Sequence, residues 1–152
     1  MKLIVVCGQR NSGKTSWVCA LVSEYTKRGF KVGTLKHTHH RHDVEGKDTD
    51  RHQVSGAEKV LLVSSKGLAI YESYTFEPTL EKLSQMYFSD FDIVFAEGYR
   101  TSEEAKIVVD NDPDANTVNV IADVPPAIDG VVEELALQTL VEAIEGYFKE
   151  RE

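Results

Sequence analysis

Short apolar runs alternate along the chain with longer segments whose apolar residues recur at helical spacing. Residues 3–7 are apolar without polar alternation, a pattern typical of a strand buried on both faces of a sheet. From Thr15 to about Arg28, apolar residues recur every three or four positions, which predicts a helix that stops at Gly29. Residues 30–36 predict a second strand. Strand, helix and strand in this order indicate a parallel βαβ unit with a right-handed crossover.

The rest of the chain continues this alternation. Further strands are predicted at 59–64, 68–71, 91–98, 107–109 and 118–122, with 68–71 returning antiparallel to 59–64. Further helices are predicted at about 49–56, from Pro78 onward, and at 132–149. Leu80, Leu83 and Tyr87 are the expected inner face of the helix that follows Pro78. No linker, internal repeat or low-complexity tract divides residues 1–152, so we expect one α/β domain with a mostly parallel sheet flanked by helices.

Composition and charge narrow the function classes. The chain is 41% hydrophobic and 28% charged, as in a globular protein with a real core. A net charge of −8 disfavours non-specific binding to nucleic acid or anionic membranes. No run has the length of a membrane span, and no signal-peptide pattern opens the chain. Cys7 and Cys19 form neither a disulfide framework nor a paired-cysteine metal site, so we expect a reduced, cytoplasmic setting.

The turn after the first predicted strand carries the most specific motif. Residues 8–15 read GQRNSGKT and match the pattern G-x-x-x-x-G-K-[ST] at every fixed position. A buried strand precedes the turn and a helix follows it, so backbone N–H groups and the positive end of the helix converge on an anion. We expect Lys14 to reach the outer phosphates of a nucleotide and the Thr15 hydroxyl to hold Mg²⁺. A chance glycine turn would not explain the agreement of the motif with both flanks.

A second carboxylate is expected beside this loop, because the Mg²⁺ shell needs one. The predicted strand 91–98 offers Asp92 and Glu97. In a parallel strand Asp92 lies at the amino end, and Glu97 lies at the carboxyl end, where the phosphates are held. We therefore favour Glu97 as the acid on the Mg²⁺ side, directly or through water. The alternative is that Glu97 only ends the strand in solvent.

The polar segment 37–51 leaves the second predicted strand at the same edge of the sheet. Asp48 is expected to orient an attacking water or to contact Mg²⁺, with Asp43 and Asp50 as alternatives at similar reach. The acids of such a polar segment can also be solvated surface.

A histidine cluster opens the same segment, at His37, His39, His40 and His42. The cluster has neither a Cys partner nor the fixed geometry of a typical zinc site. We interpret these rings, together with Lys36 and Arg41, as an anion-binding patch in preference to a structural metal site.

The sequence defines the base of the nucleotide less well than its phosphates, because the [NT]-K-x-D signature of many GTPases is absent and Asp123 is a single acid. The residues alone do not decide between guanine and adenine.

The combined motifs resemble the molybdopterin-guanine dinucleotide biosynthesis protein B (MobB) family over nearly the whole chain. The resemblance rests on GQRNSGKT, LKHTHH, GKDTDRHQVSGA, DIVFAEGYR and EEAKIVV. It implies a three-layer P-loop NTPase-like fold and a homodimer that binds GTP with Mg²⁺ and hydrolyses it slowly. It also implies a role in molybdenum cofactor biosynthesis, beside a partner nucleotidyltransferase, MobA, that attaches GMP to molybdopterin. Molybdopterin-bearing proteins are further expected partners.

By position, the resemblance places the nucleotide contacts at Gly8, Asn11, Ser12, Gly13, Lys14, Thr15 and Ser16. The expected catalytic residues are Lys14, Asp48 and Glu97, and the expected metal ligands are Thr15, Asp48 and Glu97. The histidines His37, His39 and His40 are expected to contact an anion or the pterin phosphate. Two other functions stay open, a non-catalytic nucleotide-dependent adaptor and a small-molecule kinase. The kinase ranks last because no arginine-rich lid is present. No arginine or glutamine stands out as a catalytic finger, which suits either slow hydrolysis or none.

Overall fold

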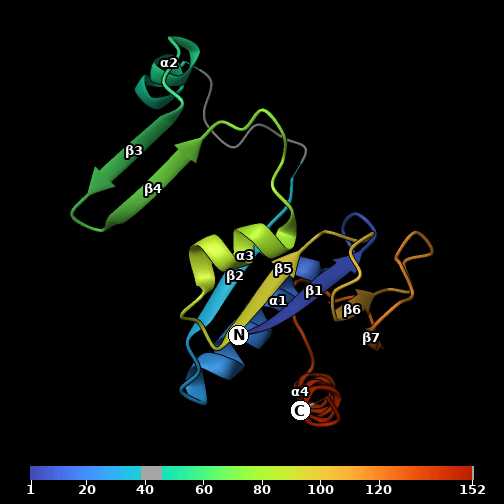
Figure 1. Ribbon diagram of the computed structural model, residues 1–152. Coiled ribbons are helices and arrows are strands. Elements are labelled where there is room, and N and C mark those ends of the chain that lie inside the picture. The colour runs from blue at the N-terminus through green and yellow to red at the C-terminus, as the bar shows by residue number, and fades with distance from the viewer. Residues whose placement is uncertain (39–45, 152) are drawn as a thin grey trace. The chain divides into compact units, whose positions relative to one another are not determined.

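The computed structural model describes residues 1–38 and 46–151 (Figure 1). These residues form two compact units, which we call the sheet unit and the hairpin unit. The sheet unit comprises Met1–His37 and Leu80–Glu152, and the hairpin unit comprises Thr38–Thr79. The hairpin unit is thus an insertion in the sequence of the sheet unit, and the single domain that we expect over 1–152 stays a prediction. The predicted site residues His39, His40, His42 and Asp43 lie outside the described residues.

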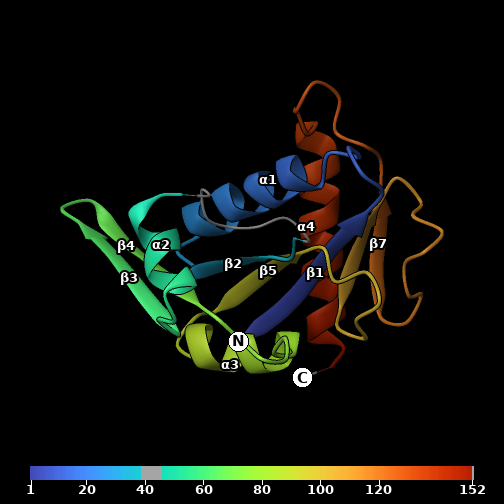
Figure 2. The same cartoon turned by 90° about the horizontal axis from the view of Figure 1, so that it is seen from above.

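Five strands form the sheet of the sheet unit: β1 (Lys2–Gly8), β2 (Val32–Lys36), β5 (Ile93–Glu97), β6 (Lys106–Val109) and β7 (Val120–Val124). Their order is β2-β5-β1-β6-β7, and every neighbouring pair is parallel (Figures 1 and 2). The predicted mostly parallel sheet is therefore confirmed. Because the carboxyl ends of parallel strands meet at one edge, the segments that follow all five strands leave the sheet together.

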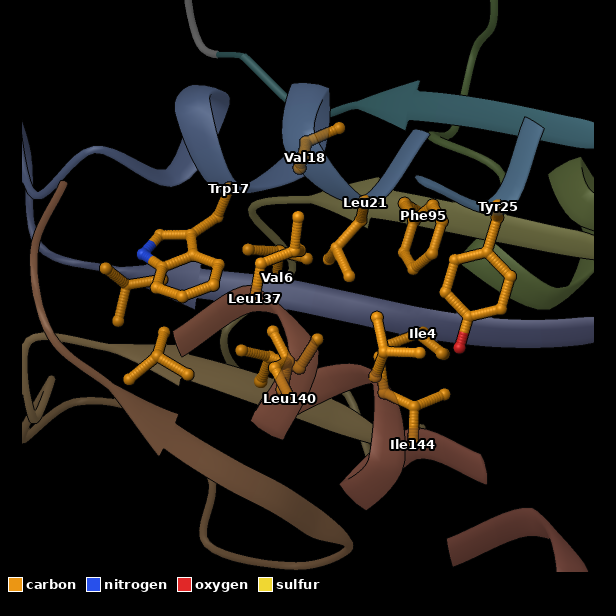
Figure 3. Packing of buried hydrophobic residues seen from close by; sticks show 14 of the residues in the cluster. Ile4, Val6, Trp17, Val18, Leu21, Tyr25, Phe95, Leu137, Leu140 and Ile144 are labelled. Atoms are coloured by element: carbon orange, nitrogen blue, oxygen red, sulfur yellow. The ribbon is translucent and has the colours of Figure 1, made fainter. Parts of the chain in front are cut away.

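Helices cover both faces of this sheet, which explains why β1 is apolar without alternation. The helices α1 (Lys14–Lys27) and α4 (Glu134–Lys149) pack on one face, and α3 (Leu80–Phe88) packs on the other. On the first face, α1 and α4 enclose Ile4 and Val6 of β1, as Figure 3 shows. On the second face, Leu80 packs with Val5 and Cys7. None of the helices among the described residues has the length and hydropathy that crossing a membrane requires.

The hairpin unit holds the remaining elements, α2 (Asp48–Val54), β3 (Lys59–Ser64) and β4 (Gly67–Glu72). The strands β3 and β4 pair antiparallel, with Leu61 opposite Ile70 and Val63 opposite Leu68. The predicted return of 68–71 against 59–64 is therefore confirmed.

Two details of the predicted elements were wrong. Tyr87 is 40% exposed, whereas Leu80 is buried and Leu83 is half-buried, as expected. Ser84 completes the inner face of α3, and its hydroxyl donates to the Leu80 carbonyl at 2.7 Å. The last strand runs from Val120 to Val124 and so includes Asp123, which the pattern placed after a strand at 118–122. The strand does not begin at residue 118, as predicted, because Asn119 has a φ of 58° and the Val118 N–H donates to the Asn116 side chain at 2.9 Å.

Candidate nucleotide site at the carboxyl edge of the sheet

Two glycines of the loop between β1 and α1 are required by close packing. A Cβ on Gly8 would lie 2.6 Å from the Val109 carbonyl oxygen and 2.8 Å from Ser12 Oγ. Gly13 is the N-cap of α1 with a φ of 86°, and a Cβ there would lie 2.7 Å from Ala127 Cβ. Both approaches are far closer than a real Cβ tolerates, so the loop is pinned between β6 and the segment after β7.

The amino end of α1 is left without a side-chain cap. No side chain hydrogen-bonds at Gly13, and the first turn contains no acidic residue. The first N–H groups of a helix have no partner within the helix, and the helix dipole makes this end positive. Ser12 Oγ, close to this end, is buried and has no hydrogen-bond partner among the described residues. Unpaired donors beside a positive helix end fit an anionic ligand such as a phosphate chain.

Lys14 folds back over the loop. Its Nζ donates to the Gln9 carbonyl at 2.5 Å. Burial lowers the pKa of Lys14, the negative charge of Glu97 opposes this effect, and the positive charge of Arg100 reinforces it. The ammonium group therefore lies over the loop backbone, between charges of both signs.

The last residue of the loop motif is joined to the end of β5. Thr15 Oγ1 donates toward both carboxylate oxygens of Glu97, at 2.9 Å and 3.1 Å. Lys36 Nζ lies 3.0 Å from Glu97 Oε1. Glu97 is only 9% exposed, and the pairing of Val6 with Glu97 sets its position beside β1. The structure thus brings Thr15, Lys36 and Glu97 together, and Glu97 does not simply face solvent.

The Thr15 hydroxyl and the Glu97 carboxylate are groups of the kind that a magnesium ion binds. Mg²⁺ prefers oxygen ligands, keeps several waters, and takes one or two protein oxygens plus phosphate oxygens. The Thr15 hydroxyl and the Glu97 carboxylate are such oxygens, at hydrogen-bonding distance from each other. No group of three or more His, Cys, Asp or Glu side chains in residues 1–38 and 46–151 could hold a metal ion by itself.

His37 lies at the same edge, directly after β2. Its backbone N–H donates to the Glu97 carbonyl at 3.0 Å, and its ring centroid lies 5.1 Å from that of Tyr99. Gly98 has a φ of 103°, and a Cβ there would lie 3.2 Å from His37 Cβ. A glycine at position 98 therefore lets the chain leave β5 close to His37.

The segment after β7 forms a second wall of the site, which sequence reasoning missed. Trp17 Nε1 donates to the Pro125 carbonyl at 2.9 Å, which holds this segment against α1. Asp129 and Gly130 have φ of 50° and 78°, and the Val131 N–H donates to the Ile128 carbonyl at 2.8 Å. This is the geometry of a type I′ turn, and the Asp-Gly dipeptide was its sequence signal.

A cavity of about 400 Å³ lies between this wall and α1. Its lining residues are Thr15, Ser16, Cys19, Ala20, Gly130 and Val132. The volume is in the range of small-molecule sites. The cavity begins at Thr15, so a ligand held by the glycine loop can extend into it. Asp123 lines a different cavity, beside Leu140 of α4.

Two other predicted acids belong to the hairpin unit, and a third stands at the amino end of β5. Asp48 is the first residue of α2 in the hairpin unit, so it is not among the residues that the sheet unit brings together. Asp50 is buried and accepts a hydrogen bond from the Gly46 N–H at 2.8 Å, which gives it a structural role within the hairpin unit. Asp92 lies at the amino end of β5, as expected, and accepts from the Lys31 N–H at 2.6 Å.

The parallel sheet order, the pinned glycine loop and the pairing of Thr15 with Glu97 define a P-loop NTPase-like α/β protein. A family model described as "MobB: Molybdopterin guanine dinucleotide synthesis protein B" matches residues 3–132. The chain therefore belongs to the MobB family.

Curated relatives and solved structures agree with this membership. The chain is 30% identical over 142 residues to the "Molybdopterin-guanine dinucleotide biosynthesis adapter protein" of Escherichia coli, covering 84% of this chain and 81% of the relative. It is 28% identical over 129 residues to the probable adapter protein of the same name from Bacillus subtilis, covering 79% and 73%. The crystal structure of Bacillus subtilis MobB matches with a TM-score of 0.71 at 22% identity, covering 94% of this chain and 98% of that one. A crystal structure titled molybdopterin-guanine biosynthesis protein B matches with a TM-score of 0.73 at 24% identity, covering 95% and 98%.

Proposed function

We propose that this protein binds GTP with Mg²⁺ at its glycine loop, hydrolyses it slowly, and supports formation of molybdopterin guanine dinucleotide as an accessory protein. The observation that carries the nucleotide part is the placement of Thr15 Oγ1 at 2.9 Å and 3.1 Å from the two Glu97 oxygens. The biosynthetic setting is supported by membership in the MobB family and by the printed names of the relatives.

Seven residues of the loop and of the first turn of α1 have proposed roles. Backbone N–H groups of Gly8, Asn11, Ser12, Gly13 and Ser16 surround the phosphates, and Lys14 binds the outer ones. Thr15 and Glu97 hold Mg²⁺, which would neutralise phosphate charge during hydrolysis. The cavity that begins at Thr15 offers room for the nucleoside.

Three further roles are proposals carried by the family resemblance. Asp48, in the first turn of α2, orients the attacking water or contacts Mg²⁺. His37 contacts the phosphate of the nucleotide or of the pterin, and its position beside Glu97 supports this role. His39 and His40 are proposed to share that contact.

The surroundings of Glu97 favour slow turnover. Its carboxylate is engaged with the Thr15 hydroxyl and the Lys36 ammonium group. Because both carboxylate oxygens already accept from these groups, the carboxylate is poorly placed to bind and activate an attacking water. The same observation favours a second candidate function, a nucleotide-dependent adaptor in which binding matters more than turnover. The word "adapter" in the relatives' names agrees with that candidate.

We also propose that the protein acts as a homodimer through the hairpin unit and contacts a guanylyltransferase of the MobA type. Leu61, Val63, Leu68 and Ile70 pair across β3 and β4 and therefore share one face. Their exposed fractions run from 46% to 70%. A two-stranded hairpin with an apolar face is marginal by itself, and a second copy of the chain would bury that face.

Calorimetric titration tests the nucleotide assignment. We expect GTP to bind more tightly with Mg²⁺ than with EDTA, and more tightly than ATP under the same conditions. Tighter binding of ATP would overturn the guanine assignment and favour the kinase. Absence of binding for GTP, GDP and ATP would overturn the proposed function as a whole.

A further inference from the structure

Hydrogen bonds at its start, middle and end hold the segment between β5 and β6 in place. At its start, the Gly98 N–H donates to the Val6 carbonyl at 3.0 Å. At its end, the buried Lys106 donates from Nζ to the Ser102 carbonyl. Between these points, the Arg100 carbonyl accepts from the Asn116 N–H at 2.9 Å. The backbone of Arg100 is therefore fixed at the carboxyl edge of the sheet.

Only one nitrogen of the Arg100 guanidinium group is engaged. Its Nη1 lies 3.1 Å from Asp114 Oδ2 and 3.7 Å from Asp112 Oδ1. No described residue accepts a hydrogen bond from Nε or Nη2, and the side chain is 41% exposed. A guanidinium group carries five N–H donors in a rigid fork. Three donors are therefore available to an acceptor that comes from solvent.

Asp112 places a buried negative charge beside this guanidinium group. The Asp112 side chain is fully buried, its Oδ1 accepts from the Asp114 N–H at 3.2 Å, and its Oδ2 has no partner among the described residues. A buried carboxylate keeps its cation close, because losing the cation leaves an uncompensated buried charge. Asp114 is 75% exposed and contributes a weak, solvent-screened pair. The guanidinium group of Arg100 is thus engaged at Nη1, whereas the edge that carries Nε and Nη2 is open to solvent.

The charge of Arg100 reaches the glycine loop. Burial is the main cause that lowers the pKa of Lys14 and raises the pKa of Cys7 at the end of β1. The positive charge of Arg100 lowers both pKa values, and the negative charge of Asp112 acts in the opposite direction on both. Arg100 and Lys14 repel each other, and an anion bound within reach of both would convert this repulsion into attraction. Lys14 already belongs to the phosphate site, so the anion that suits this place is a phosphate group.

We infer that Arg100 is a further phosphate-binding residue of the site, with the buried Asp112 as a counter-charge at its engaged nitrogen. This inference rests on the proposed function, because it presupposes a nucleotide at the glycine loop. The phosphate is either the terminal phosphate of that nucleotide or the phosphate monoester of a second ligand. In both cases the free edge of the guanidinium fork binds two phosphate oxygens, a geometry that lysine cannot reproduce.

Three variants test the inference: Arg100→Gln, Arg100→Lys, and Arg151→Gln as an exposed control near the carboxyl terminus. We would titrate each with Mg·GTP, with Mg·GDP, and with inorganic phosphate on the GDP-loaded protein. If Arg100 binds the terminal phosphate, Arg100→Gln weakens GTP at least about tenfold and GDP less than about twofold. If it binds a separate phosphate, GTP affinity is kept and inorganic phosphate no longer binds to the GDP-loaded protein.

The Lys substitution separates a specific contact from general charge. A bidentate contact predicts that Arg100→Lys restores only part of the lost affinity, whereas Arg151→Gln changes nothing. Equal affinities of wild type and Arg100→Gln for all three ligands would overturn the inference while leaving the proposed function intact. If wild type binds neither GTP nor GDP, the proposed function fails and this inference fails with it. Thermal unfolding of each variant excludes loss of the fold as the cause.

Discussion

Thr15 and Glu97 are 82 residues apart in sequence, and the Thr15 hydroxyl lies at hydrogen-bonding distance from both oxygens of the Glu97 carboxylate. The parallel pairing of β1 with β5 creates this relationship, because it places the end of β5 beside the start of the glycine loop. The pair joins the first residues of α1 to the end of a neighbouring buried strand. It supplies the hydroxyl and carboxylate oxygens that a magnesium-dependent phosphate site requires.

Replacing Glu97 by Gln is expected to remove most of the effect of Mg²⁺ on GTP binding. The substitution keeps the size of the side chain and one acceptor oxygen but removes the negative charge that attracts the cation. We expect the gain in GTP affinity from Mg²⁺ to fall by about tenfold or more, whereas the GTP affinity measured in EDTA should change little. The control Glu142→Gln alters an exposed acid on α4. An unchanged Mg²⁺ effect in Glu97→Gln would leave Glu97 as a structural partner of Thr15 and Lys36.

Replacing Gly13 by Ala is expected to destabilise the fold through a clash with the second wall. Gly13 and Gly29 have the same φ of 86°, but a Cβ on Gly13 would lie 2.7 Å from Ala127, whereas a Cβ on Gly29 meets nothing within 4 Å. Gly29→Ala therefore measures backbone strain alone, about 1 kcal/mol, and Gly13→Ala should cost about 2–4 kcal/mol. Denaturant unfolding gives both values. Equal losses would show that the segment after β7 does not pack against the loop.

Tyr25→Phe is expected to stabilise the protein at high pH. Burial is the main cause that raises the pKa of Tyr25 to about 12 from its ordinary value of 10. Between these values the unfolded chain has released the proton and the folded chain keeps it, so stability falls as pH rises. The phenylalanine removes this part of the loss, and at neutral pH it also removes a buried hydroxyl that has no partner among the described residues. Unfolding curves from pH 8 to pH 12 test this, with Tyr147→Phe as the half-buried control. Parallel loss of stability in wild type and Tyr25→Phe would contradict the prediction.

Lysine substitutions on the exposed hairpin face are expected to produce monomers. Leu61 and Ile70 lie opposite each other and are 53% and 46% exposed, so charges there should leave the fold of one chain intact. Two desolvated ammonium groups in a dimer interface would weaken association strongly. Val54→Lys, at a 74% exposed position of α2, is the matched control. Light scattering over a concentration series measures the mass. A dimer that survives both Leu61→Lys and Ile70→Lys would place the interface elsewhere.

Much of the sheet unit was predictable from the sequence because its signals are local. The apolar run of β1 and the helical spacing of α1 depend on burial alone. The position of Glu97 beside the glycine loop was predictable because the carboxyl ends of parallel strands meet at one edge of a sheet. The predicted start of β7 was wrong because Asn116 and Asn119 redirect the backbone, and the apolar pattern of 118–122 gives no sign of this effect.

The remaining parts of the site depend on contacts between distant loops. The ion pair between Arg100 and Asp112 requires the segments after β5 and β6 to meet, and neither segment has a periodic pattern. The second wall likewise depends on Ala127 and Gly130 packing against α1. The Asp129-Gly130 dipeptide indicated a turn, but nothing in the sequence placed that turn beside Ser16.

The central claim is that the glycine loop holds a nucleotide through Lys14, and calorimetric titration of Lys14→Ala with Mg·GTP tests it most directly. Lys149→Ala, an exposed substitution at the end of α4, is the matched control. We predict that Lys14→Ala keeps the wild-type unfolding temperature within a few degrees and loses about a hundredfold or more in GTP affinity, because a charge-paired phosphate contact disappears. Lys149→Ala should bind as wild type does. A Lys14→Ala protein that binds GTP with unchanged affinity would contradict the account.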